Sequence, residues 1–298
     1  MGPYLLKNIG DLVTLEPMAS RNAPGGVVTD QDLGRLGPQA WLALRDGKVQ
    51  DFGVDTPPED YSSYAAIDCL GGTVLPGLVD SHTHSVFGGT RAQEFGLRLA
   101  GRSYQEIAAA GGGIQSSVQA TRDATLEQLT LALSSQLARF SYLGITTVEV
   151  KSGYGLTVED EVKQLQAVQA ASHKSQVRVV PTLLALHGIP KEHRDKPADY
   201  IAAVTDKLLP QVKELGLAEY VDAFIEQGYF SVSDVEGYVE KAKGMGLGVR
   251  LHADEFTHCG GAAAAAQWQA ASADHLQFAS DDDAKAMADA GVVATMLP

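Results

Sequence analysis

The order of hydrophobic and polar positions divides the chain into two parts with different rhythms. Up to residue 70, short alternating stretches predict β-strands at 4–6, 41–44 and 48–53, separated by turn residues such as Arg45-Asp46-Gly47. From residue 71 onward, apolar runs of strand length alternate with longer segments of helical period. We therefore expect a small N-terminal β-domain of the β-sandwich type over residues 1–70, and a larger α/β domain over residues 71–298.

The larger part predicts a regular succession of strands and helices. Its apolar runs predict seven strands, at 74–79, 145–150, 177–186, 220–226, 247–252, 271–275 and 292–297. The segments between them predict helices near 103–110 and 125–143, and at 158–174, 197–215, 231–245, 260–269 and 280–290. This alternation favours a TIM-like (β/α)8 barrel, which needs eight parallel strands. We expect the eighth strand and the rest of the C-terminal part of the barrel to lie beyond Pro298.

Histidines gather where the predicted strands end. His82 and His84 follow the first strand, and His187, His252 and His275 close three others, so five of the eight histidines lie at strand ends. The carboxyl ends of barrel strands carry the catalytic groups, and residues two apart on a strand face the same side. His82 and His84 can therefore share one metal ion. Imidazole ligands suit zinc or iron better than magnesium or calcium.

Composition and charge exclude several other classes of protein. The chain has 298 residues, of which 45% are hydrophobic, which is enough for a large buried core. Its 23 basic and 37 acidic residues leave a net charge of −14, which argues against nucleic acid or an anionic membrane as the main partner. Cys69 and Cys259 form no disulfide framework, and no signal peptide or long apolar run is visible. We expect a cytoplasmic protein.

The motifs carry a family resemblance. The apolar run 74–79, with the following His82 and His84 and the strand-end His252 and His275, resembles the amidohydrolase superfamily of metal-dependent barrels. More narrowly, the chain is similar to the imidazolonepropionase family of histidine degradation, over essentially its whole length. The closer resemblance rests on the segments 84–91, 110–114, 149–156, 252–255 and 272–275. The segment 151–155, Lys-Ser-Gly-Tyr-Gly, is far more specific than a His-x-His pair.

The resemblance implies a reaction and a set of metal ligands. The reaction is hydrolysis of the ring amide of 4-imidazolone-5-propanoate to N-formimidoyl-L-glutamate. His82, His84 and His252 would hold one zinc or iron ion, with an aspartate on the eighth strand as a fourth ligand. Such an ion lowers the pKa of bound water toward neutrality and so activates it for attack on the ring carbonyl.

The resemblance also implies roles for five further side chains. Glu255 and His275 would be catalytic, handling proton transfer and polarisation of the carbonyl, and Glu255 would also contact the substrate. Arg91 would bind the propionate carboxylate through two parallel hydrogen bonds, while Tyr154 and His187 would fix the ring. The expected partner is thus a small molecule with a carboxylate, and we expect the protein to be a homodimer.

Several of these residues also have purely structural interpretations. Arg91 could pair with Glu94 on the surface, His187 could be a core histidine satisfied by the backbone, and His275 could orient the start of a helix. In two-metal members of the superfamily, a modified lysine on the fourth strand bridges the ions, but the predicted strand 220–226 contains no lysine. We therefore expect one ion and interpret Lys151, on the second strand, as packing or loop support.

Two other classes of function remain open from the sequence. Another cyclic amidohydrolase or a deaminase of the same superfamily would share the metal residues but would have no evident need for Arg91. A non-catalytic barrel that serves as an interaction scaffold would have no need for the metal residues or for Glu255. Metal content separates the scaffold from the enzymes, and activity on a substrate without a carboxylate would separate the two enzymes.

Overall fold

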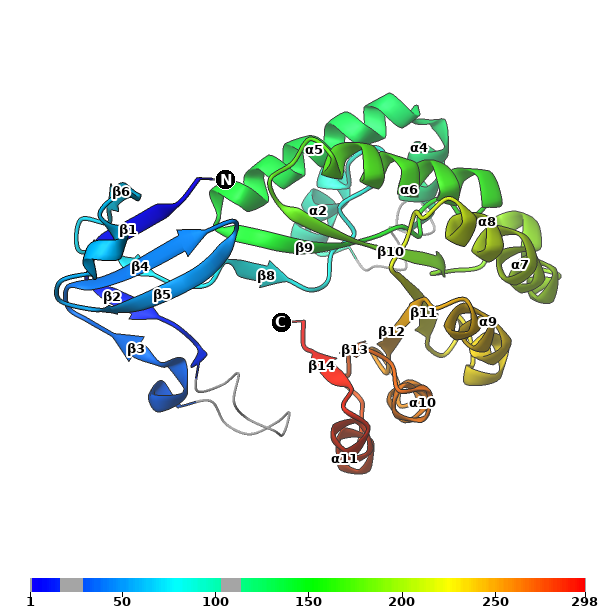
Figure 1. Ribbon diagram of the computed structural model, residues 1–298. Helices are drawn as coiled ribbons and strands as arrows, with labels where there is room; N and C mark the ends of the chain where they lie inside the picture. Colours follow the sequence, from blue (N-terminus) through cyan, green and yellow to red (C-terminus); the bar gives the residue numbers. More distant parts are fainter. Residues whose placement is uncertain (1, 17–28, 103–113, 298) are drawn as a thin grey trace. The chain divides into compact units, whose positions relative to one another are not determined.

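The chain forms two compact units in the computed structural model, Met1–Gly77 and Leu78–Pro298 (Figure 1). The structure describes residues 2–16, 29–102 and 114–297. The helix expected near 103–110 and the glycine-rich part of segment 110–114 lie outside the described residues.

The N-terminal unit contains two small sheets. The first has four strands in the order β5-β4-β1-β6 and the second has three in the order β3-β2-β7. Strands β4 and β5 form an antiparallel hairpin whose turn residues, Asp46 and Gly47, have φ values of 54° and 74°. Two positive φ values match the twist of a two-residue hairpin turn. The elements are β1 (Tyr4–Ile9), β2 (Asp11–Val13), η1 (Asp30–Leu33), β3 (Arg35–Leu36), β4 (Ala40–Arg45), β5 (Lys48–Val54), η2 (Glu59–Tyr61), β6 (Ala65–Asp68) and β7 (Thr73–Val74).

The second unit is built on a curled sheet of seven strands in the order β8-β9-β10-β11-β12-β13-β14. Every neighbouring pair is parallel, and the order follows the chain, so each crossover leads to the adjacent strand. The seven strands expected from the sequence are therefore confirmed. They are β8 (Leu78–Asp80), β9 (Ile145–Lys151), β10 (Arg178–Leu186), β11 (Tyr220–Ile225), β12 (Gly248–Ala253), β13 (Ser272–His275) and β14 (Val293–Thr295).

Helices line the outer side of this sheet (Figure 1). The main hydrophobic core lies between the sheet and these helices. Within the part of the chain that the structure describes, four helices begin at a hydroxyl side chain that accepts a backbone hydrogen bond, namely Thr125, Thr157, Ser231 and Ser280. The helices are α2 (Ala92–Leu99), α4 (Ile114–Asp123), α5 (Leu126–Tyr142), α6 (Val158–Ser172), α7 (Pro197–Ala203), α8 (Leu209–Glu214), α9 (Val232–Gly244), α10 (Gly261–Trp268) and α11 (Asp281–Ala290), with the short turns η3 (Lys191–His193) and η4 (Val204–Leu208). Within the described residues, no helix combines the length and apolarity that crossing a membrane requires.

Two of the expected elements differ in the structure. The strand expected at 74–79 is divided, because Thr73–Val74 pairs with β2 in the N-terminal unit while Leu78–Asp80 pairs with β9. Pro76 lacks a backbone N–H and Gly77 lacks a side chain, which explains the break. The helix expected at 197–215 is helical from Pro197 to Glu214, but a π turn at η4 interrupts it.

Candidate metal centre and active site

Three of the strand-end histidines come together near the carboxyl ends of strands β8 and β12. His82 and His84 follow β8, and His252 lies in β12. Each offers one ring nitrogen, and these nitrogens all lie within 4.8 Å of one another. The Nε2 atoms of His84 and His252 are 3.2 Å apart. The structure thus assembles the three residues that the sequence singled out as metal ligands.

Two aspartates orient two of these imidazoles, those of His82 and His252. His82 Nδ1 lies 2.7 Å from Asp274 Oδ2, and His252 Nδ1 lies 2.9 Å from Asp222 Oδ2. The backbone N–H of His252 also donates to Asp222 Oδ1 at 3.0 Å. A neutral imidazole that donates from Nδ1 carries a lone pair on Nε2, which is the arrangement that metal-binding histidines use. The converging nitrogens therefore fit a cation such as zinc or iron.

Burial keeps the imidazoles of His84 and His252 uncharged. Desolvation lowers the pKa of His252 to about 3, against the raising effect of the Asp222 carboxylate. Desolvation also places the pKa of His84 well below its ordinary value, and the neighbouring His187 and His252 lower it further. Since a metal ion competes with protons for the imidazole lone pair, a neutral histidine is the state that binds metal.

A cluster of buried charges lies against the two aspartates. Lys151 Nζ donates to Glu149 Oε1 and to Asp222 Oδ2, both at 2.8 Å, and lies 3.3 Å from Asp274 Oδ2. Glu149 Oε1 also accepts from Thr182 Oγ1 at 2.6 Å. The side chain of Lys151 is fully buried. Burial opposes its charge, but the surrounding carboxylates raise its pKa above the ordinary value, so the ammonium stays charged.

Glu255 and His275 lie beside the histidine cluster. His275 closes β13, and its ring centre is 5.2 Å from that of His82 and 5.1 Å from that of His252. Its Nδ1 lies 3.7 Å from Glu255 Oε1. Burial raises the pKa of Glu255 and lowers the pKa of His275 to about 4. His275 also has a φ of 79°, a strained backbone conformation of the kind that concentrates at functional sites.

His187 and Tyr154 border the cluster on another side. The His187 ring stacks on His84 with centres 5.0 Å apart and planes at 20°. Its Nδ1 lies 3.0 Å from the carbonyl oxygen of Gly153, which suits donation from Nδ1 and leaves Nε2 for another partner. The ring centre of Tyr154 lies 5.4 Å from that of His187 and 5.8 Å from that of His84. His187 therefore has the backbone partner of a structural histidine and also faces the site.

Arg91 pairs with Glu94 in the structure. It lies at the start of α2, and its Nε and Nη2 both contact Glu94 Oε2 at 2.8 Å. About two fifths of its side chain is exposed, at 41%. The surface ion pair considered from the sequence is thus present.

Comparisons with known proteins agree on the fold. A 5-methylcytosine deaminase from Klebsiella pneumoniae has a TM-score of 0.64 at 16% identity, covering 97% of this chain and 64% of that structure. An amidohydrolase from an environmental sample of the Sargasso Sea has a TM-score of 0.64 at 14% identity, covering 99% and 64%. These similarities support the TIM-type barrel of the amidohydrolases as the fold. No protein-family model matches the chain.

Proteins with similar sequences identify the family to which the chain belongs. The imidazolonepropionase of Bacillus velezensis is 43% identical over 294 residues, which is 99% of this chain and 68% of the relative. That of Alkaliphilus metalliredigens is 41% identical over 301 residues, which is 100% of this chain and 70% of the relative. The chain belongs to the imidazolonepropionase family. A further relative so named, from Symbiobacterium thermophilum, is 45% identical, and the chain spans 63% of its length.

Sequence reasoning missed the buried partners of this imidazolonepropionase-type site. Asp222 and Asp274 orient two histidines, and Lys151 contacts both, yet Lys151 was interpreted as packing or loop support. The available signal was a charged residue inside a run that is otherwise apolar. A charge in a fully buried strand needs a partner of opposite charge, so a buried carboxylate partner for Lys151 could have been expected, although the pattern does not say which one.

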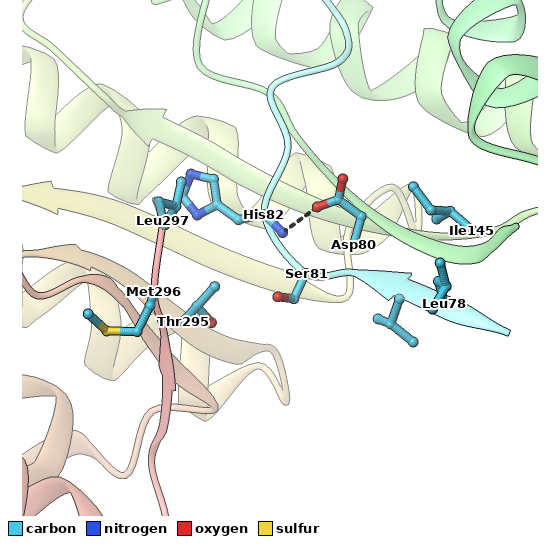
Figure 2. A pocket seen from close by; sticks show the side chains of 9 residues that line it. Leu78, Asp80, Ser81, His82, Ile145, Thr295, Met296 and Leu297 are labelled. Atoms are coloured by element: carbon cyan, nitrogen blue, oxygen red, sulfur yellow. Dashed lines mark hydrogen bonds between the residues drawn. The ribbon is translucent and has the colours of Figure 1, made fainter. Parts of the chain in front are cut away.

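A hollow of about 480 Å³ lies next to His82, between the edge strands β8 and β14 (Figure 2). In this hollow the backbone N–H of His82 donates to Asp80 Oδ1 at 3.4 Å (Figure 2). The lining residues are Leu78, Val79, Asp80, Ser81, His82, Ile145, Thr295, Met296 and Leu297.

Proposed function

We propose that this member of the imidazolonepropionase family hydrolyses the ring amide of 4-imidazolone-5-propanoate to N-formimidoyl-L-glutamate, a step of histidine degradation. The observation that carries the proposal is the convergence of three imidazoles, with Glu255 and His275 beside them. Relatives at 43% and 41% identity that bear this name, each matched over nearly all of this chain, support the same reaction.

We propose that His82, His84 and His252 bind one zinc or iron ion. Their converging nitrogens and the aspartate partners of two of them support this assignment. When bound, such an ion lowers the pKa of a coordinated water and polarises a carbonyl oxygen. An aspartate on an eighth strand remains our prediction for the fourth ligand.

Glu255 and His275 are the proposed proton carriers. Hydrolysis adds the hydroxyl of water to the ring carbonyl carbon, breaks the bond from that carbon to the ring nitrogen, and returns a proton to the nitrogen. Glu255 can accept the proton of the attacking water, because burial raises the pKa of its carboxyl group. Neutral His275 can donate a hydrogen bond to the carbonyl oxygen, and its 3.7 Å separation from Glu255 allows the two groups to act on the same substrate.

Arg91, Tyr154 and His187 are the proposed substrate contacts, with Glu255 as a fourth. The rings of Tyr154 and His187 lie beside the histidine cluster, where they can hold the substrate ring. Arg91, whose side chain is partly exposed, can bind the propionate carboxylate through its guanidinium group. The homodimer and the cytoplasmic location expected from the sequence remain predictions, which light scattering and cell fractionation would test.

The reaction can be tested with the purified protein and substrate generated in situ. Mass spectrometry should detect a product that is heavier than the substrate by one water, and elemental analysis should find about one zinc or iron ion for each chain. His252→Ala should lose both the metal and the turnover, while His173→Ala, at an exposed position after α6, should keep both. A metal-loaded protein that ignores this substrate but hydrolyses a cyclic compound without a carboxylate would instead support another amidohydrolase or a deaminase.

A further inference from the structure

We propose that Lys151 is a positioning residue for the metal centre. Its ammonium group holds Asp222 and Asp274 in the orientations in which they accept hydrogen bonds from the ligand histidines. The inference rests on the proposed function only in taking His82 and His252 as metal ligands.

The same carboxylate oxygens contact both Lys151 and the histidines. Asp222 Oδ2 lies 2.8 Å from Lys151 Nζ and 2.9 Å from His252 Nδ1. Asp274 Oδ2 lies 3.3 Å from Lys151 Nζ and 2.7 Å from His82 Nδ1. One ammonium group therefore connects the two carboxylate–histidine pairs. One pair lies on the neighbouring strands β11 and β12, and the other joins β13 to the segment after β8.

The charged groups around Asp222 and Asp274 indicate that Lys151, and not another basic residue, holds these two carboxylates. Among the residues that the structure describes, Lys151 is the only lysine or arginine with a nitrogen within 4.0 Å of a carboxylate oxygen of Asp222 or Asp274. The Nε of Arg250 approaches Glu149 instead, at 3.8 Å. Two buried carboxylates that both contact the ammonium group repel each other when it is removed, so each gains by turning away from its histidine.

Lys151 could instead have a purely structural role, in which it only compensates buried negative charge. Substitution of Glu149 distinguishes this role from the positioning of Asp222 and Asp274. Glu149 Oε1 contacts Lys151, but the hydrogen bonds that the structure gives the Glu149 carboxylate come from Lys151 and Thr182 rather than from the ligand histidines. Replacing Glu149 and Lys151 together removes one negative and one positive charge. The double variant thus restores the balance of charge while leaving Asp222 and Asp274 without their common partner.

The test compares Lys151→Met, Glu149→Gln and the double variant with the wild-type protein. Zinc affinity is measured by competition with a chelator, and the ¹⁵N signals of the imidazole nitrogens are recorded on metal-free protein. We expect Glu149→Gln to stay within about threefold of the wild-type zinc affinity. Lys151→Met and the double variant should lose about 10- to 100-fold, the range found when outer partners of metal ligands are removed. Their His82 and His252 signals should change from a single Nδ1–H tautomer to a mixture.

Either of two results would overturn the proposal. One is a double variant that binds zinc as the wild type does, with unchanged imidazole signals, because Lys151 would then only compensate charge. The other result is that His82 or His252 already populates a mixture of tautomers in the metal-free wild-type protein. This measurement needs no variant and so does not depend on how the variants fold. Neither readout is turnover. A protein that behaves as expected here but fails to open the imidazolone ring refutes the proposed function alone.

Discussion

The two ring nitrogens of His252 face different partners. Nδ1 meets the Asp222 carboxylate at 2.9 Å, and Nε2 faces Nε2 of His84 at 3.2 Å. The first contact fixes which nitrogen carries the hydrogen, and the second marks where a cation would lie. At the scale of single residues, the site is therefore defined as much by the partners of the ligands as by the ligands.

Glu255 tests the assignment of the proton carrier. It lies on the loop after β12 and not among the three histidines that can hold the metal, so Glu255→Gln should leave metal content unchanged. The amide cannot accept the proton of water, and kcat should fall by roughly two to four decades. Elemental analysis and steady-state kinetics on the same preparation measure both quantities. Turnover close to that of the wild type would exclude Glu255 as an acid or base.

Arg91 tests the recognition of the substrate carboxylate. Losing a charged partner of a desolvated carboxylate costs about 2–5 kcal/mol, so Arg91→Met should lower kcat/KM for imidazolone propionate by about a hundredfold or more, with metal retained. Arg98→Met, at an exposed position on the same helix α2, is the matched control and should have little effect. An analogue without the propionate should be a poor substrate that is insensitive to Arg91→Met. Equal losses on both compounds would show that Arg91 and Glu94 only support the loop.

At the scale of elements, the sequence pattern predicted the succession of strands because each strand of a parallel sheet is an apolar run between helices. The histidines at the strand ends could be expected for the same reason. The pattern could not show that Pro76 divides one apparent strand between two sheets, since both halves are apolar. Nor could it show that Lys151 meets Asp222, because that contact joins strands β9 and β11, which are separated in the sheet by β10.

The loop between β9 and α6 depends on the buried carboxylate of Glu161. Glu161 Oε1 accepts the backbone N–H groups of Gly155 and Leu156 at 2.8 and 2.9 Å, and Oε2 accepts that of Gly153 at 3.0 Å. Gln164 Oε1 accepts the N–H of Tyr154 between them, at 3.1 Å. Helix α6 thus holds the loop that presents Tyr154 to the site.

Glu161→Gln should destabilise this loop, because an amide places N–H donors where one carboxylate oxygen accepted. We expect a loss of about 1–3 kcal/mol in the free energy of unfolding, measured by urea denaturation. Glu159→Gln changes the same residue type in the same first helical turn at an exposed position, and it should stay within about 0.5 kcal/mol. If the two variants lose equal stability, the buried hydrogen bonds of Glu161 are not what stabilises the loop.

At the scale of the whole molecule, the buried histidines make the stability of metal-free protein depend on pH. Burial lowers the folded-state pKa of His252 to about 3 and that of His275 to about 4, both below the ordinary value of 6.5. Between pH 6.5 and 4, the unfolded chain therefore binds protons that the folded chain excludes. The free energy of unfolding should fall as pH falls through this window, by up to about 1.4 kcal/mol per pH unit for His252.

Urea denaturation with a chelator present, at intervals from pH 7 to 4.5, measures this dependence. His275→Gln removes one of the titrating groups and should make the slope shallower. The exposed His173→Gln should leave the slope as it is in the wild type. A stability that is flat below pH 6.5 would mean that these imidazoles are as accessible to protons in the folded protein as in the unfolded chain.

The buried charged residues that contact the histidines also imply a trade-off between thermal stability and metal-dependent activity. A protein in which well-packed apolar side chains replace a buried ion cluster is often as stable or more stable. Conformational stability alone therefore does not favour the buried charges of Glu149, Lys151, Asp222 and Asp274. A laboratory selection that rewards only heat tolerance would tend to replace them. The selected variants would unfold at a higher temperature, but they would lack the carboxylates that orient the histidines for metal binding.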